Sequence, residues 1–155
     1  MKTTRGDLLK LADDGAFDVI AHGCNCFCTM GAGIAKGIVA KFPAAYEADL
    51  QTRKGDKAKL GTCSFADIPR DSGMLTVINA YTQFDFRGRG VKADYEAIRS
   101  CMRWICATYP KQRIGLPKIG AGLARGDWTT IEGIIEEELR GVDVTIVEYR
   151  AEDHQ

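Results

Sequence analysis

The amino-acid sequence predicts a three-layer α/β/α domain with a mixed, largely parallel central sheet. Candidate strands and helices alternate along the chain, which is typical of a parallel sheet with helices on both faces. The length of 155 residues fits one domain. Hydrophobic residues make up 45% and charged residues 27%, the balance of an ordinary folded globule. We therefore expect one domain over residues 1–150 and a polar tail over 151–155.

Short apolar segments bounded by turn residues predict the strands of this sheet. Residues 17–21 are apolar enough to form a strand that is buried on both faces. Pro117 ends another predicted strand, over residues 113–116. The predicted strands cover residues 1–5, 17–21, 62–68, 75–81, 113–116 and 142–149.

Apolar residues at helical spacing predict the helices. Ile34, Ile38 and Phe42 lie four residues apart, and Pro43 suits the first turn of the next helix. The predicted helices cover residues 8–11, 31–42, 43–55, 92–108 and 128–139, and the predicted loops cover residues 22–30, 83–90 and 118–127.

Composition restricts the classes of function. Basic and acidic residues number 21 each, so the formal net charge is zero. This disfavours nucleic acid as a partner, because general polyanion binders are basic. No apolar run approaches the ~18 residues of a membrane span, and the first residues lack the apolar core of a signal peptide. We therefore expect a cytoplasmic protein with free thiols and no membrane partner.

Three of the six cysteines suggest a metal site, because they occupy every second position of one segment, at Cys24, Cys26 and Cys28. Zinc ligands, however, usually form two separated C-x₂₋₄-C pairs, and the sequence contains no second pair. The alternative is a tight loop of small, soft residues. We expect no metal and no cofactor, and no cysteine nucleophile, since nothing in the sequence fixes a thiolate.

Two glycine-rich segments, residues 30–35 and 119–124, share one context: each follows a predicted strand and precedes a helix. Ligands of open α/β sheets bind beyond the carboxyl ends of the strands. Glycine lets backbone N–H groups approach a phosphate there, and the helix dipole favours negative charge. We predict that the two loops clamp a diphosphate; ordinary strand-to-helix turns are the alternative. The predicted phosphate-binding residues are Gly31, Ala32, Gly33, Ile34, Ala35, Gly120, Ala121, Gly122, Leu123 and Ala124.

Neither loop matches the common nucleotide motifs. Lys36 and Arg125 stand where the G-x-G-x-x-G fingerprint requires its third glycine, and no G-x-x-x-x-G-K-[ST] sequence occurs. The sequence therefore disfavours nicotinamide redox chemistry and ATP hydrolysis.

Five segments in this order, followed by Trp128, carry a family resemblance: residues 6–9, 19–25, 30–35, 77–80 and 116–123. Together they resemble a macrodomain, the ADP-ribose-binding module, over nearly the whole chain. Residues 21–26 and 30–35 are most similar to the branch that holds the yeast-type ADP-ribose-1″-phosphate phosphatase and the terminal ADP-ribose protein glycohydrolase. The resemblance implies the macrodomain fold and an ADP-ribose ligand, and we expect a monomer.

The resemblance also implies roles for single residues. Asp7 resembles the acid that accepts a hydrogen bond from the adenine amino group, and Leu8 would supply a neighbouring backbone N–H. Asn25 falls where the family contacts the distal ribose. Tyr149, at the end of the last strand, would pack on the adenine ring.

Two departures concern the chemistry. The glycohydrolase branch uses a Lys just after the strand at residues 77–80, but residues 81–84 contain none. That branch also uses an Asp two residues after the second glycine of the second loop, and this chain has Ala124 there. We predict that the lysine–aspartate mechanism is absent.

The function expected from this pattern is removal of the phosphate of ADP-ribose 1″-phosphate. The alternatives are a non-catalytic ADP-ribose reader and a hydrolase of ADP-ribosyl or O-acetyl-ADP-ribose linkages. His22 is a candidate general acid or base, or a loop-holding residue. Asp127 is a candidate base or water holder, or a helix N-cap. Arg125 would neutralise a phosphate, or be a solvated surface residue.

Overall fold

A six-stranded sheet, in the order β1-β6-β5-β2-β4-β3, forms the centre of the computed structural model, which describes residues 1–149. Five strands are parallel, and the edge strand β3 is antiparallel to β4. This confirms the predicted mixed, largely parallel sheet. The predicted tail over 151–155 lies outside the described residues. The strands are β1 (Lys2–Arg5), β2 (Val19–Cys24), β3 (Cys63–Ile68), β4 (Leu75–Tyr81), β5 (Arg113–Leu116) and β6 (Asp143–Glu148).

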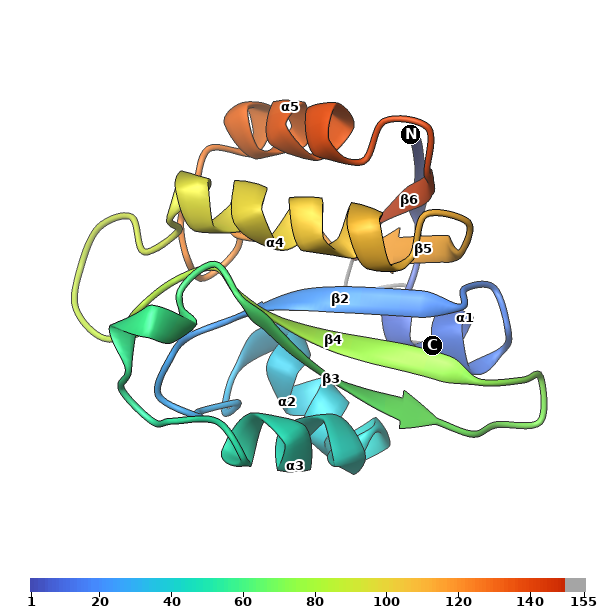
Figure 1. The fold of residues 1–155 in the computed structure, drawn as a ribbon, viewed down its shortest axis with the longest axis horizontal. Coiled ribbons are helices and arrows are strands. Elements are labelled where there is room, and N and C mark those ends of the chain that lie inside the picture. The colour runs from blue at the N-terminus through green and yellow to red at the C-terminus, as the bar shows by residue number, and fades with distance from the viewer. Residues whose placement is uncertain (150–155) are drawn as a thin grey trace.

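Helices cover both faces of the sheet, as the alternation of elements predicts. Figure 1 shows α4 and α5 on one face and α2 and α3 on the other. The helices are α1 (Leu8–Asp13), α2 (Gly33–Lys41), α3 (Pro43–Leu50), the short 3₁₀ helix η1 (Lys57–Lys59), α4 (Tyr95–Thr108) and α5 (Trp128–Glu138).

An apolar core lies on each side of the sheet. On the α4 and α5 side, Ile98, Met102 and Ile105 of α4 are fully buried, as their helical spacing predicts. On the other side, a Cβ on Gly115 of β5 would lie 2.6 Å from the Phe17 ring. Only glycine permits this contact, so the α1 side packs directly onto the backbone of β5.

One boundary differs from the sequence prediction in a way that matters for the site. The predicted second strand ends at residue 21, whereas β2 continues to Cys24 because His22 and Cys24 pair with Asn79 and Tyr81 of β4. A stretch of mixed polarity can remain in a strand when it continues the backbone pairing with the neighbouring strand. His22 therefore belongs to the sheet and not to the following loop.

The five parallel strands end at the same edge of the sheet, which we call the carboxyl edge. The loops that follow β2, β4 and β5 leave the sheet there, on the left in Figure 1. Both glycine-rich loops are among them. In the described part of the chain, none of the helices combines the length and the apolar character needed to cross a membrane.

Candidate ligand-binding site

The two glycine loops face each other across the carboxyl edge. A Cβ on Gly33, at the start of α2, would lie 3.3 Å from Cδ1 of Leu123 in the second loop. Gly33 has φ of +59°, a conformation that suits glycine. Leu123 is 73% exposed, so its side chain is not part of the core. The facing arrangement predicted from sequence is therefore present.

The first glycine loop (residues 31–35) offers unpaired backbone donors. The N-cap of α2 is Ala32, which has no side chain that could cap the helix. Within residues 1–149, no hydrogen-bond acceptor is found for the N–H groups of this loop. Unpaired amides at the start of a helix form a site for an anion.

The second glycine loop (residues 120–124) is held in a tight turn. The N–H of Gly126 donates to the carbonyl of Gly120 (2.7 Å), and the N–H of Arg125 donates to the carbonyl of Gly122 (3.0 Å). Arg125 is exposed and has φ of +58°. The N–H groups of Gly122, Leu123 and Ala124 have no acceptor among the described residues. These donors complete the second half of the site.

Asp7, Leu8 and Tyr149 lie beside each other at the ends of the paired strands β1 and β6. Asp7 is the N-cap of α1, and its Oδ1 accepts the N–H of Leu9 at 3.0 Å. The side chain of Leu8 is buried in the core, so only its backbone faces this region. Tyr149 is 52% exposed. The strand order thus groups the three predicted adenine contacts.

Asn25 shapes the turn between β2 and the first glycine loop. Its Oδ1 accepts the N–H of Phe27 (2.8 Å) and its Nδ2 donates to the carbonyl of Thr29 (2.9 Å). Each group retains a second lone pair or hydrogen. Asn25 therefore holds the turn and remains able to accept one further hydrogen bond and to donate another.

His22 lies away from the carboxyl edge, within the sheet. The ring is 0% exposed, and its Nε2 lies 2.8 Å from Oδ1 of Asn79. Nδ2 of Asn79 donates to the carbonyl of Ala45 (2.9 Å), so Oδ1 is the acceptor and His22 donates through Nε2. Burial lowers the pKa of His22 to about 4. The burial of His22 and its bond to Asn79 fit the loop-holding alternative, and the catalytic role of His22 stays a prediction.

Asp127 is the N-cap of α5, at the end of the second-loop segment. Its Oδ2 accepts the N–H of Thr130 (3.1 Å) and its hydroxyl (2.6 Å). The Thr130 side chain and backbone hydrogen bonds lower the pKa of Asp127, and the residue is exposed. The second oxygen, Oδ1, has no partner among the described residues. An ionised carboxylate with one free oxygen is suited to holding a water molecule.

Comparison with known proteins decides the family. The Macro domain family model matches residues 21–135, which include both glycine loops. The chain belongs to the Macro domain family.

Individual relatives agree with this assignment. The macrodomain is 37% identical over 96% of both chains to an uncharacterized 17.5 kDa protein of Enterobacteria phage T4. It is 28% identical over 148 residues to ADP-ribose glycohydrolase OARD1 of Bos taurus, covering 94% of this chain and 88% of the relative. A segment of 46 residues is 48% identical to an Aspergillus oryzae ADP-ribose 1″-phosphate phosphatase, covering 30% and 21% of the two chains. A solved structure from Bacteroides thetaiotaomicron superimposes with a TM-score of 0.79 at 26% identity, covering 96% and 99%.

The macrodomain carries a rim of cations beside the turn that holds Asn25. Besides the buried Lys59, residues 51–60 contain three basic residues, all exposed, and one acidic residue, and residues 84–92 contain three and one. The two segments meet at Phe27: the Arg87 guanidinium lies 4.9 Å from its ring centroid, and Gly55 packs on its edge. A shallow cavity of about 400 Å³, widely open to solvent, lies at residues 53–56. The net charge of zero therefore conceals a local excess of positive charge.

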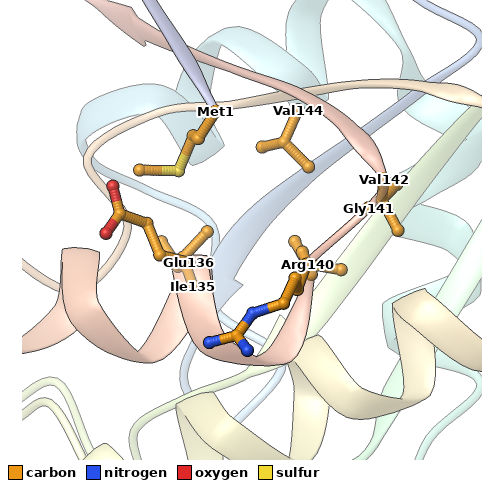
Figure 2. Close-up of a pocket in the computed structure, with 8 residues that line it drawn as sticks. Met1, Ile135, Glu136, Arg140, Gly141, Val142 and Val144 are labelled. Atoms are coloured by element: carbon orange, nitrogen blue, oxygen red, sulfur yellow. The ribbon is translucent and has the colours of Figure 1, made fainter.

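A second cavity, of about 300 Å³, lies far from the glycine loops. Figure 2 shows it between the end of α5 and the start of β6, where Met1, Glu136, Arg140 and Val144 surround it. The start of a parallel strand lies at the edge opposite its carboxyl end, so this cavity is not part of the macrodomain site. Among residues 1–149, no group of three His, Cys, Asp or Glu side chains is placed to hold a metal ion.

Sequence reasoning missed several buried polar residues behind the site. Thr82, directly after β4, is 0% exposed. Among the described residues its Oγ1 has no hydrogen-bond partner, and it lies 2.6 Å from the position that a Cβ of Gly23 would take. Lys59 and Asp49 are also buried. No pattern in a single sequence distinguishes these residues from surface ones.

Proposed function

We propose that this macrodomain binds ADP-ribose at the carboxyl edge and removes the phosphate of ADP-ribose 1″-phosphate. The observation that carries the proposal is the pair of facing glycine loops, whose unpaired amides point to a diphosphate ligand. Charge-assisted hydrogen bonds from such amides are stronger than neutral ones. In this proposal residues 31–35 and 120–124 hold the two phosphates.

The strand order determines where the adenine end and the distal ribose end of the ligand lie along the sheet. Asp7 accepts a hydrogen bond from the adenine amino group, the N–H of Leu8 donates to the same base, and Tyr149 packs on its ring. Asn25 contacts the distal ribose from the other side of the loops. This arrangement is supported by the placement of the three adenine candidates just after β1 and β6, on the far side of β5 from β2.

A phosphorylated distal ribose suits this chain for two reasons. The cation rim lies beside the turn of Asn25, where a 1″-phosphate would be placed, and Arg125 follows the second glycine loop. The residues of the lysine–aspartate mechanism are missing, since residues 81–84 contain no Lys and Ala124 stands in place of Asp. These features favour phosphate removal over cleavage of a protein linkage.

The test is calorimetry with ADP-ribose followed by a phosphate-release assay on ADP-ribose 1″-phosphate. We expect binding and release. Binding without release contradicts the phosphatase and leaves a reader of ADP-ribose. Release of ADP-ribose from a modified protein, with no phosphate release, favours the glycohydrolase alternative.

Asp127 is the proposed water holder, and Asp127→Asn separates this role from the N-cap. Asparagine caps a helix as well as aspartate does, so we expect the free energy of unfolding to stay within ~0.5 kcal/mol. A positioned acid or base contributes at least ~100-fold, so kcat for phosphate release should fall by about that factor. Asp127→Ala should in addition cost ~1 kcal/mol of stability. An unchanged kcat in Asp127→Asn leaves the carboxylate only its capping role.

A further inference from the structure

A buried polar cluster lies behind the turn at residues 25–29 and takes no part in the proposed chemistry. Its members are Lys59 of η1, Asp49 of α3 and Tyr81 of β4, which are 7%, 1% and 1% exposed. The Tyr81 hydroxyl donates to Oδ1 of Asp49 (2.7 Å), and Nζ of Lys59 lies 4.7 Å from the centroid of the Tyr81 ring. Burial raises the pKa of Asp49, against the opposing effects of the Tyr81 hydrogen bond and the Lys59 charge.

Lys59 contacts the turn directly. Its Nζ donates to the carbonyl of Cys26 (3.1 Å) and lies 3.7 Å from Sγ of Cys28. The same carbonyl accepts the N–H of Gly55 (2.7 Å). A lysine ammonium is costly to bury, so it remains buried only where it is well paired. The turn is thus built around a charged group.

The turn depends on contacts of this kind because its backbone is strained. Cys28 has φ of +56°, which a residue with a Cβ adopts only when its surroundings impose it. Its Sγ donates to the carbonyl of Asp49 (3.3 Å), the same residue that accepts the Tyr81 hydroxyl. The cluster therefore fixes both sides of Cys28.

The turn joins two parts of the proposed site. Asn25 stands at its start, and the first glycine loop begins two residues after its end. A change in the turn is expected to move both of them, whereas Asp7 and Tyr149 lie just after β1 and β6, on the far side of β5 from β2. The adenine end of the site should be insensitive to the cluster.

We propose that Lys59 is a positioning residue that holds the turn at residues 25–29 in the form that receives the diphosphate and distal ribose. The inference rests on the proposed function, because it assigns the turn to one end of ADP-ribose. Lys59 touches no part of the ligand and acts through Cys26 and Cys28.

The test compares two ligands, ADP-ribose and AMP, in Lys59→Met. Loss of one hydrogen bond to a charged donor should weaken ADP-ribose binding about tenfold, while AMP binding stays within about twofold, since AMP relies on the adenine end. Lys59→Arg keeps the charge and should restore ADP-ribose binding to within about threefold. Lys111→Met is the matched control: Lys111 is exposed in the turn before β5, at the edge of the sheet opposite the glycine loops, and its loss should change neither affinity.

Several outcomes overturn the proposal. Equal losses for both ligands in Lys59→Met indicate general destabilisation, and unchanged ADP-ribose binding indicates that the turn needs no ammonium. Should Lys59→Met not fold, Tyr81→Phe retains the ring below Lys59 and removes the hydroxyl, which is hydrogen-bonded to Asp49 and Ser64. It should weaken ADP-ribose binding about threefold and leave AMP binding unchanged, and equal effects on both ligands overturn the proposal. If the wild type binds AMP but not ADP-ribose, the proposed function itself fails.

Discussion

Replacing Gly122 by aspartate is expected to weaken ADP-ribose binding about 1000-fold, equivalent to ~4 kcal/mol. Gly122 is exposed, has no atom within 4 Å of the position of a Cβ, and does not have a positive φ. The side chain therefore fits without strain. The aspartate side chain places a carboxylate among the amides of the second glycine loop. This carboxylate repels a diphosphate and competes with it for the N–H donors.

The matched control is Gly133→Asp on α5. Gly133 is also exposed with open space at its Cβ position, but it lies on a helix away from both loops. Calorimetry should show wild-type affinity for Gly133→Asp and almost none for Gly122→Asp, with both variants folded by circular dichroism. Similar affinities in the two variants would contradict the assignment of the diphosphate to this loop.

His22 is expected to make the protein acid-sensitive. The ordinary pKa of histidine is 6.5, and burial lowers the pKa of His22 to about 4 in the folded protein. Above pH 6.5 the ring is neutral in both the folded and the unfolded protein, so its protonation does not lower the free energy of unfolding. Between pH 6.5 and 4 only the unfolded chain takes up the proton, so stability falls as the pH falls. A difference of this size amounts to about 3 kcal/mol once the pH is below 4.

The measurement is the free energy of unfolding in urea at pH 7.5 and 4.5, for wild type and His22→Gln. The carboxylates titrate alike in both proteins, so their contributions to the pH dependence of stability cancel in the comparison. The loss on acidification should be about 2.5 kcal/mol larger for the wild type, and His154→Gln, which removes the other histidine, is the control. Phosphate release at pH 7.5 should be little changed in His22→Gln. Equal acid losses would contradict the lowered pKa of the buried ring, and abolished phosphate release with the fold intact would support a catalytic His22.

The sequence was sufficient for the features that repeat a local rule. The glycines of residues 31–35 and 120–124 follow strands of a parallel sheet, and parallel strands end at one edge. The sequence alone therefore predicts that the two loops face each other. Asp127 before an apolar helix likewise predicts an N-cap, and its bonds to Thr130 confirm that prediction.

The features that sequence reasoning missed depend on contacts between distant segments. The strand β2 was predicted to end before His22 because the stretch from His22 to Cys24 loses its apolar character, whereas the register with β4 continues it. Lys59 lies in a polar stretch that resembles a surface segment. Its burial arises only when α3, η1 and β4 meet behind the turn at residues 25–29.

The most direct test of the site is a ¹H–¹⁵N NMR titration of the labelled protein with ADP-ribose. We predict that the amide signals of residues 31–35 and 120–124 move downfield together and saturate at one affinity, because those N–H groups gain phosphate acceptors. Unmoved signals in both loops, with shifts confined to residues such as Arg140 and Val144 around the distant cavity, would contradict it.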